Sequence, residues 1–238
     1  MSERRRVLVC DDEPQILRAL RVILREAGFE VAPAATAREA LDMAALRPPD
    51  AAIVDLVLPD GDGVGVCRSL REWTELPILV LSAIGEETEK VRALNAGADD
   101  YVTKPFGPAE LIARLNAVLR RAEPKQDGEP VLGADGLELD LLAHEVRRDG
   151  EPVHLTPTEF DLLHYLAGRP GRVATREELL EQVWGYEIPS GARTVDSHVR
   201  SLRRKLGAEI VRTVHGVGYA VERETERDDS EPTSREGA

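Results

Sequence analysis

Four apolar segments in the first half of the chain end in side chains that could act together chemically. Asp11 and Asp12 follow the first segment, Asp55 ends the second, Ser82 ends the third, and Lys104 ends the fourth. If these segments are parallel strands of one sheet, their carboxyl ends meet at one edge, where open α/β sheets bind ligands. We therefore predict a pocket in which Asp55 is phosphorylated with the help of Mg²⁺.

Each group in this pocket has a chemical role. Mg²⁺ prefers oxygen ligands, which the carboxylates of Asp11, Asp12 and Asp55 and the main-chain carbonyl of Val57 could supply. The metal and the Lys104 ammonium would offset the charge of the incoming phosphoryl group while Asp55 forms an acyl phosphate. The simpler interpretation is that Asp11 or Asp12 caps a helix and Asp55 lies in a turn. That interpretation suits each acid alone, but it does not explain why all four strand ends carry a needed group.

Strand and helix patterns alternate through residues 1–121. The first helix is expected after Asp12, with Gly28 ending it in a left-handed conformation, because apolar residues recur there at helical spacing. Pro108 suits the first turn of the last helix. Five strands alternating with five helices imply a doubly wound parallel sheet covered on both faces. The other expected strands are near 29–32, 51–55, 77–82 and 100–104, and the other helices are 36–46, after Gly63, 87–96 and 108–121.

The second half of the chain has a different character. Residues 122–130 are polar and contain Pro124, Gly128 and Pro130, which is typical of a linker. Alternating segments near 137–140, 144–148 and 152–155 then predict a small antiparallel sheet. The acidic end lacks large apolar side chains, so we expect it to be disordered. The predicted division is a phosphoacceptor domain at 1–121, a linker at 122–130, a second domain at 131–223 and a tail at 224–238.

Three helices and a hairpin are expected to complete the second domain. Thr156, Pro157 and Glu159 form a capping-box pattern that opens a helix. Thr175 caps a second helix that runs to Trp184, a third covers 194–206, and a hairpin turns at His215-Gly216. This order predicts an α+β winged helix-turn-helix domain.

The net charge of −13 argues against simple nonspecific binding to nucleic acid. Residues 193–212 nevertheless hold six basic and two acidic residues. Polar residues on the third helix share one face, opposite an apolar stripe, and such a helix fits the major groove. Whether Trp184 belongs to the core or contacts phosphate stays open. We expect Arg193, Ser197, His198 and Arg200 near bases, Thr194, Arg203 and Arg204 near phosphates, and Arg212, Thr213 and His215 on or beside the wing.

Two cysteines, Cys10 and Cys67, form neither a disulfide framework nor a metal-binding pattern. No apolar run approaches the roughly 20 residues that a membrane span needs, and the N-terminus has no apolar signal segment. These features predict a cytoplasmic protein with buried, reduced thiols.

The residues together resemble a known family. Asp11-Asp12, Asp55, Ser82 and Lys104-Pro105 resemble the receiver domain of two-component response regulators, whose fold is flavodoxin/CheY-like. The segments 155–160 and 193–206 resemble the DNA-binding domain of the OmpR/PhoB type, so the resemblance covers about residues 5–222. Within that family, the segments 58–63 and 104–107 are most similar to KdpE-like receivers.

The resemblance implies a role for each pocket residue. Asp55 would accept phosphate from a sensor histidine kinase. Asp12 and Asp55 would bind Mg²⁺ or Mn²⁺ directly, and Asp11 directly or through water. Lys104 would bind the phosphoryl group, Ser82 would hydrogen-bond a phosphate oxygen and move inward, and Tyr101 would then rotate inward as a switch. An ordinary tyrosine at a strand edge is the alternative for Tyr101.

The resemblance also implies a homodimer that forms on phosphorylation and binds direct repeats in promoter DNA, with RNA polymerase as a further partner. Its interface would be the face of the fourth helix, fifth strand and fifth helix. We expect exposed ion pairs across the dimer that select register more than they supply affinity. The alternative is a solvated charged face. The expected pairs are Lys90 with Glu110, Asp99 with Arg114, and Asp100 with Arg121.

Two other classes of function compete with a phosphorylation-switched, non-enzymatic regulator. A phosphatase or phosphotransferase would use the aspartyl phosphate in turnover, but many such enzymes carry a second acid two residues after the nucleophile, where this chain has Val57. A DNA-binding scaffold whose receiver is no longer phosphorylated would not need a complete pocket.

Overall fold

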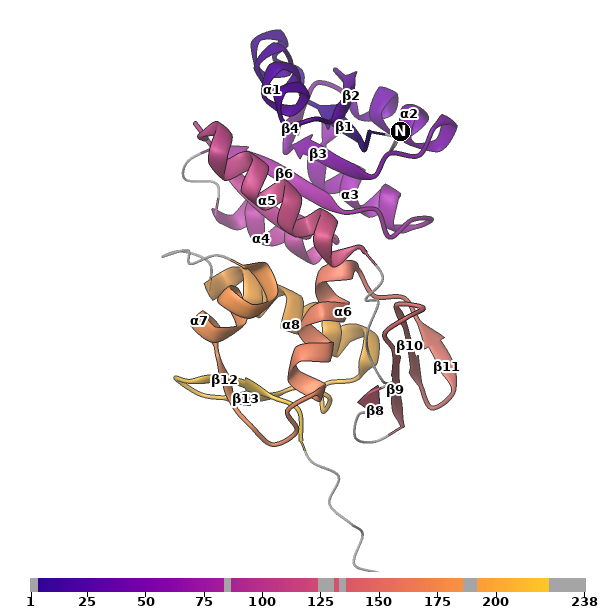
Figure 1. Cartoon of the computed structure of the whole chain (residues 1–238), viewed down its shortest axis with the longest axis vertical. Helices are drawn as coiled ribbons and strands as arrows, with labels where there is room; N and C mark the ends of the chain where they lie inside the picture. The colour runs from indigo at the N-terminus through magenta and orange to yellow at the C-terminus, as the bar shows by residue number, and fades with distance from the viewer. Residues whose placement is uncertain (1–3, 84–86, 124–130, 133–135, 186–191, 223–238) are drawn as a thin grey trace, which may run out of the picture.

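The computed structural model describes residues 4–83, 87–123, 131–132, 136–185 and 192–222. In these ranges the chain forms two domains, one above the other in Figure 1. Residues 124–130 of the predicted linker and the predicted tail at 224–238 lie outside the described residues.

The first domain is the predicted five-stranded parallel sheet with helices on both faces. Its strand order is β2-β1-β3-β6-β7, and all four pairings are parallel. Two short strands, β4 (Val57–Leu58) and β5 (Gly61–Asp62), form a separate hairpin that the sequence did not predict. The sheet strands are β1 (Arg6–Cys10), β2 (Glu30–Ala34), β3 (Ala51–Asp55), β6 (Ile78–Ala83) and β7 (Asp100–Lys104), and the helices are α1 (Pro14–Glu26), α2 (Ala37–Leu46), α3 (Gly63–Arg71), α4 (Glu87–Asn95) and α5 (Pro108–Arg121).

Alternate residues along the central strands enter two apolar cores, one on each face of the sheet. Val7 and Val9 pack with the residues of α1 and α5, whereas Leu8 and Cys10 pack with those of α2, α3 and α4. Gly28 ends the first helix region with a φ of 92°, as expected of the residue that closes it. The second strand begins at Glu30 and not at Phe29, because Phe29 turns into the core instead of pairing.

The second domain is the predicted winged helix. Thr156 and Glu159 make the reciprocal capping box at the start of its first helix. Two strands escaped prediction because each is only two residues long: β8 joins the small sheet and β12 pairs with the wing. Its elements are β8 (Val131–Leu132), β9 (Leu137–Asp140), β10 (Glu145–Arg148), β11 (Glu151–Val153), α6 (Pro157–Ala167), β12 (Ala174–Thr175), α7 (Arg176–Leu179), the π-helix η1 (Leu180–Trp184), α8 (Ala192–Leu206), β13 (Arg212–Val214) and β14 (Gly218–Ala220).

One apolar core holds the three helices and two sheets of this domain together. The predicted apolar stripe of α8 lies in it, with Val195, Val199 and Leu202 at most 1% exposed. Trp184 is fully buried in this core, yet its indole N–H donates to the carbonyl of Asp99 in the first domain at 3.3 Å. Trp184 therefore belongs both to the core and to the contact between the domains.

Candidate functional site

The strand order brings the predicted pocket residues to one edge of the first sheet. β1, β3, β6 and β7 lie side by side, and Asp11, Asp55, Ser82 and Lys104 stand at or next to their carboxyl ends. One carboxylate oxygen from each of Asp11, Asp12 and Asp55 lies within 4.8 Å of the others. Asp12 is exposed and the other two acids are buried. The three acids therefore fit a hard divalent cation, which needs such clustered oxygens and keeps several waters.

Lys104 bridges two acids of this pocket. Its Nζ lies 2.8 Å from Asp11 Oδ2 and 2.8 Å from Asp55 Oδ2, and 3.5 Å from Glu13 Oε1. Asp11 does not cap α1, whose N-cap is Glu13 and has no side-chain cap; instead Asp11 Oδ1 accepts from the Glu13 N–H at 2.9 Å, in the turn before the helix. Asp11 therefore serves the turn into α1 and the pocket at the same time.

Burial and ion pairing shift the protonation of two pocket groups. Burial raises the pKa of Asp55 above its ordinary value, and the hydrogen bond and charge of Lys104 oppose this only in part. For Lys104, burial disfavours the ammonium, but hydrogen bonds to Asp11 and Asp55 outweigh it and raise the pKa. The amine is therefore firmly cationic, while the carboxylate of Asp55 is held in a poorly solvated place. A second positive charge at this edge would stabilise that carboxylate.

Ser82 and Tyr101 occupy neighbouring strands between the pocket and α4. Ser82 is fully buried, and its Oγ has no hydrogen-bond partner among the described residues. A buried hydroxyl without a partner is costly, so the Ser82 O–H is available to donate to an incoming acceptor. Tyr101 is 6% exposed, and Lys90 Nζ lies 5.0 Å from its ring centroid, within the range of a cation–π contact.

The turn after Asp55 depends on Gly63. Its N–H donates to the Leu56 carbonyl at 2.9 Å, which closes the loop that follows β3. A Cβ on Gly63 would lie 2.1 Å from the carbonyl oxygen of Asp55, far inside contact distance. Glycine is therefore required here, because only it allows α3 to begin against the backbone of Asp55.

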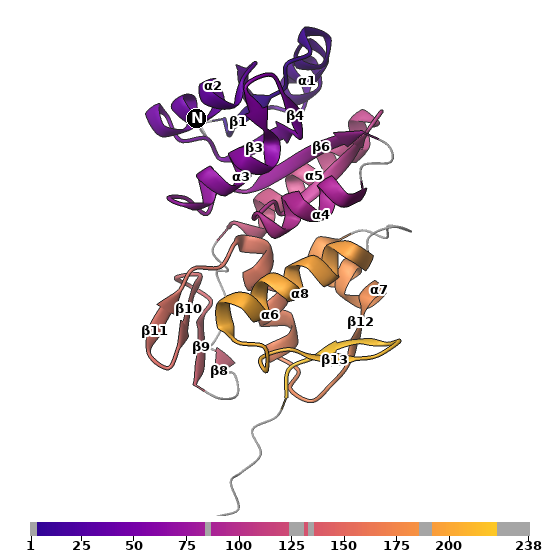
Figure 2. The same cartoon turned by 180° about the vertical axis from the view of Figure 1, so that it is seen from behind.

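The face of α4, β7 and α5 is not exposed, contrary to the expectation from the sequence. Of the six charged residues predicted to form the dimer pairs, five are 0–7% exposed and the sixth, Glu110, is exposed. The expectation was wrong because the second domain packs against this face, with α4 against α8 and α5 against α6 (Figures 1 and 2). The five buried residues are Lys90, Asp99, Asp100, Arg114 and Arg121.

Within the single chain, these charges have partners other than those expected across a dimer. Arg114 pairs with Asp100 at 3.2 Å and with Glu110 at 3.0 Å. Asp99 pairs with Arg71 at 2.8 Å and also accepts from the Ile78 N–H. These ion pairs within the chain use the same side chains that the predicted dimer pairs would use. The single chain and the predicted dimer would therefore share one set of charged residues.

Among the described residues, four of the polar contacts between the two domains involve Arg121 or Asp99, and we call this set the seam. Arg121 Nε donates to Thr158 Oγ1 at 3.1 Å, and Arg121 Nη1 donates to the carbonyl of Val183 at 3.1 Å. The Trp184 indole N–H reaches the Asp99 carbonyl, and the Thr158 N–H lies 3.4 Å from Asp99 Oδ1. Arg121 and Thr158 are at most 2% exposed, so these contacts are made away from water.

The first domain, through the packing of α4 against α8, also covers part of the helix that is expected to read DNA. Thr194, Ser197 and His198 are 2%, 5% and 2% exposed, which leaves no room for a base or phosphate beside them. Arg204 Nη2 lies 3.5 Å from the carbonyl of Asn95 in the first domain. Arg193 and Arg200, by contrast, are exposed. The predicted reading surface is thus half open and half blocked.

The remaining predicted DNA contacts lie on and around the wing. Arg203 donates to the Val211 carbonyl and to Thr213 Oγ1 at 2.6 Å, so it braces the wing from α8. Arg212 lies 3.1 Å from Glu222, and His215 is exposed at the tip. The brace by Arg203 was not apparent from the sequence, because its partners lie in a strand whose position relative to α8 depends on the tertiary fold.

Both cysteines are buried and free, as predicted. Burial raises the pKa of the Cys10 and Cys67 thiols to about 12, so both stay protonated and unreactive. Among the described residues, no helix is both long and apolar enough to cross a membrane.

Comparison with known proteins identifies both halves of the chain. Residues 7–116 match the response regulator receiver domain, and residues 150–221 match the C-terminal domain of transcriptional regulatory proteins. The DNA-binding response regulator MtrA of Mycolicibacterium smegmatis is 44% identical over 91% of this chain and 96% of its own length. The transcriptional regulatory protein KdpE of Mycobacterium tuberculosis is 46% identical over 91% of this chain and 98% of its own length.

Solved structures match both domains as well. A mutant of RitR superposes with a TM-score of 0.72 at 29% identity, covering 92% of this chain and 99% of that one. DrrB of Thermotoga maritima, described as an OmpR/PhoB homologue, matches at 30% identity over 92% of this chain and 100% of its own, with a TM-score of 0.50. Equal coverage with such different scores is expected when relatives place the same two domains differently.

Proposed function

The chain belongs to the DNA-binding response regulators of two-component systems, of the OmpR/PhoB type that includes KdpE, and from this premise we propose that phosphorylation of Asp55 switches its binding to promoter DNA. The phosphoryl donor in this proposal is a sensor histidine kinase. The response is dimerisation through the face of α4, β7 and α5, followed by regulation of transcription.

One observation carries the proposal: three carboxylates, a lysine and a buried serine hydroxyl, which has no hydrogen-bond partner among the described residues, converge at a single sheet edge. The oxygens of Asp11, Asp12 and Asp55 lie within 4.8 Å of one another, and Lys104 contacts two of these residues. Separate helix caps would not require the amine or the buried hydroxyl of Ser82. Phosphoryl transfer to an aspartate uses all of these groups.

In the proposed reaction, an Asp55 carboxylate oxygen attacks the phosphorus of a phosphohistidine. The new O–P bond forms as the P–N bond breaks, and the imidazole leaves and takes up a proton. Asp11, Asp12 and Asp55 would hold Mg²⁺ with the main-chain carbonyl of Val57, and the ion would offset the charge that accumulates during transfer. Lys104 would leave its present partners to pair with a phosphoryl oxygen, and the Ser82 hydroxyl would donate to another.

The unphosphorylated chain is proposed to rest in the closed arrangement held by the seam. Two buried hydrogen bonds from Arg121 support this state, as does the covering of Ser197 and His198 on α8. Because the receiver face that binds α8 is also the predicted dimer face, closure and dimerisation exclude each other. Movement of Ser82 and Tyr101 after phosphorylation would favour the open form, which frees both surfaces at once.

In the open form, α8 would enter the major groove and the wing would reach a neighbouring groove. Two molecules would bind direct repeats, and RNA polymerase would be a further partner. Dimer pairs would form between Lys90 and Glu110, Asp99 and Arg114, and Asp100 and Arg121 of two copies. The proposed DNA contacts are Arg193, Thr194, Ser197, His198, Arg200, Arg203, Arg204, Arg212, Thr213 and His215.

The test begins with acetyl phosphate and Mg²⁺ in Phos-tag gels. Wild type should shift and Asp55→Ala should not; equal shifts would place the phosphate elsewhere and refute the assignment. Sedimentation with beryllofluoride should then convert monomer to dimer. Selection of genomic fragments by the phosphorylated protein should recover direct repeats of short half-sites, whereas recovery of random fragments would contradict sequence-specific binding.

A turnover enzyme that uses Asp55 is the competing proposal. Val57 occupies the position two residues beyond the nucleophile, and its apolar side chain, 61% exposed, cannot orient an attacking water. We therefore expect slow loss of phosphate from the phosphorylated protein. Rapid multiple turnover of acyl or ester phosphates would favour the enzyme instead.

A further inference from the structure

His198 is buried where the seam meets the DNA-reading helix. It is 2% exposed, and its ring centroid lies 5.3 Å from that of Trp184 in an edge-to-face arrangement. Trp184 in turn donates to the carbonyl of Asp99 across the seam, and the Arg121 guanidinium lies 5.9 Å from the Trp184 ring. The imidazole thus packs on Trp184 of its own domain, and Trp184 in turn contacts Asp99 and Arg121 of the receiver.

The hydrogen bonds of this imidazole define its protonation state. Its Nδ1 lies 2.9 Å from the carbonyl oxygen of Thr194, which can only accept, so Nδ1 must carry a hydrogen. Its Nε2 is buried and has no hydrogen-bond partner among the described residues. A proton added at Nε2 would therefore create a buried charge and a donor with nothing to bind.

The charged groups around His198 do not provide that proton with a free partner. Arg121 on α5 repels a second cation, and its own Nη2 is already buried without a partner among the described residues. Two acids, Asp99 of the receiver and Glu159 on α6, favour protonation of His198. However, Arg71 already pairs with Asp99 at 2.8 Å, and Lys205 pairs with Glu159 at 2.7 Å.

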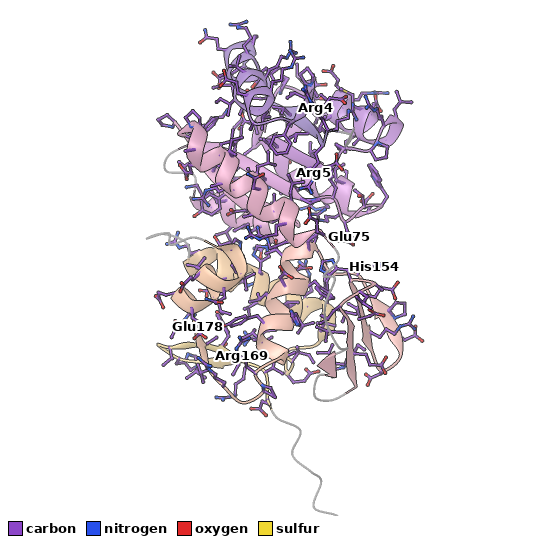
Figure 3. The ribbon with its side chains drawn as sticks, in the orientation of Figure 1. Arg4, Arg5, Glu75, His154, Arg169 and Glu178 are labelled. Atoms are coloured by element: carbon purple, nitrogen blue, oxygen red, sulfur yellow. The ribbon has the colours of Figure 1, made fainter. Side chains whose placement is uncertain are left out.

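Glu75, which Figure 3 shows at the boundary between the domains, is one more titratable group near the seam. Its side chain is exposed, yet partial loss of solvent raises its pKa; the charges of Arg71 and Lys205 oppose this shift, and those of Glu159 and Asp99 add to it. Because the pKa is raised in the closed structure, protonation of Glu75 would favour closure and cannot mimic an opening caused by histidine. Burial is the largest cause of the lowered pKa of His198, and the charge of Arg121 lowers it further. The hydrogen bond to the Thr194 carbonyl and the charges of Glu159 and Asp99 act against this and raise it.

We propose that His198 makes the closed state sensitive to acid: a proton at Nε2 cannot be accommodated in the seam, so low pH separates the domains without phosphorylation. This inference rests on the closed resting state proposed above. The direction of this pH dependence follows from the protonation of His198 in the open and closed forms. In the open form His198 regains water and binds a proton near its ordinary pKa, whereas in the closed form it stays neutral. Closure is therefore fully stable above about pH 6.5 and is lost as the pH falls.

The size of the effect follows from the ordinary histidine pKa. If closure excludes the proton, the closed-to-open ratio falls about tenfold between pH 8 and pH 5.5, since an open histidine is about nine-tenths protonated at the lower value. Small-angle scattering of the unphosphorylated full-length chain should show the radius of gyration rising over this range.

The matched variant is His198→Asn, because the asparagine amide can still donate to the Thr194 carbonyl but cannot gain a charge. This variant should keep one radius of gyration across the range, while Asp55 and Glu75 titrate as in wild type. His215→Asn, which removes an exposed histidine from the wing tip, should open like wild type. NMR titration of the His198 ring should give a lower pKa in wild type than in a variant that opens the seam, such as Thr158→Val.

The outcomes separate this inference from the proposed closed state. Opening of wild type but not of His198→Asn supports the histidine as the sensor. Equal opening of both, or wild type closed throughout, overturns the role of His198 while leaving closure intact. An extended wild type at every pH would overturn the closed resting state and this inference with it.

Discussion

Thr158 offers a way to weaken the seam by a substitution that lies outside the predicted dimer face, the predicted phosphorylation pocket and the predicted DNA contacts. Its Oγ1 accepts from Arg121 Nε at 3.1 Å, and both residues are at most 2% exposed. Thr158→Val keeps the shape of the side chain and its first-turn position in α6 but removes the acceptor. The Arg121 guanidinium then loses one of its two hydrogen bonds across the seam.

Leaving a buried charged donor without its partner costs about 1–3 kcal/mol, and the chain avoids that cost by opening. The closed-to-open ratio should therefore fall by about 5- to 150-fold. While the open fraction is small, apparent DNA affinity rises in proportion to that fraction, so the dissociation constant of the unphosphorylated protein should fall by the same factor. Fluorescence anisotropy on a duplex selected by the phosphorylated protein measures this directly.

Two comparisons make the test decisive. Thr88→Val makes the same chemical change at an exposed position of α4 and should leave the affinity as in wild type. After phosphorylation, Thr158→Val and wild type should bind DNA equally, because both are then open. The reasoning is refuted if unphosphorylated Thr158→Val is folded by circular dichroism yet binds DNA no better than wild type.

Further predictions concern the pocket and the DNA contacts. Lys104→Met should slow phosphorylation by acetyl phosphate by about 10²-fold in Phos-tag time courses, because the phosphoryl oxygens lose their cation; an unchanged rate would exclude that role. The raised pKa of Asp55 means that the carboxylate is protonated at a higher pH than usual, so in Mg²⁺-free buffer NMR titration should find its midpoint above about 3.9. Gly63→Ala should lower the melting temperature and cost roughly 1–3 kcal/mol, because its Cβ would press on the Asp55 carbonyl; an unchanged melting temperature would contradict this. Arg200→Ala should weaken binding mainly to the preferred DNA sequence. Arg204→Ala should weaken binding to all DNA sequences and reduce the slope of log affinity against log salt concentration by about one; anisotropy at several salt concentrations measures both effects.

The pocket could be predicted because each of its groups is tied to a strand end. Once Asp55 ends an apolar strand and Lys104 ends another, parallel pairing places both at one edge, and no long-range packing detail is needed. Capping residues such as Thr156 and Glu159 are equally local, and their hydrogen bonds formed as expected. The roles of the individual residues in phosphorylation and DNA binding stay predictions until the experiments above are done.

The contact between the domains could not be predicted in the same way. A charged residue such as Arg121 at the end of an amphipathic helix predicts solvent exposure, and its partners Thr158 and Val183 lie far along the chain in a different domain. Burial of such a group depends on how two finished surfaces dock. The two-residue strands β8 and β12 escaped prediction for a related reason, because such short segments carry no periodicity and exist only through their pairing.

The seam sets a limit on what phosphorylation has to accomplish. Moving a protein from about 1% open to about 99% open requires a differential free energy of about 5.5 kcal/mol. Phosphorylation does not have to supply all of it, because the open form also gains dimer contacts and DNA that the closed form cannot make. Tyr101 is positioned to couple phosphorylation to opening. It is buried in the strand next to that of Ser82, and its ring lies under Lys90 of α4, the helix that packs against α8. A ring that turned away from Lys90 would change the packing of α4, the helix that lies against α8. Tyr101→Ala should therefore open the unphosphorylated chain partly and reduce the further response to beryllofluoride, both visible in small-angle scattering. A full response in this variant would mean that the signal reaches the seam by a path that does not involve the ring.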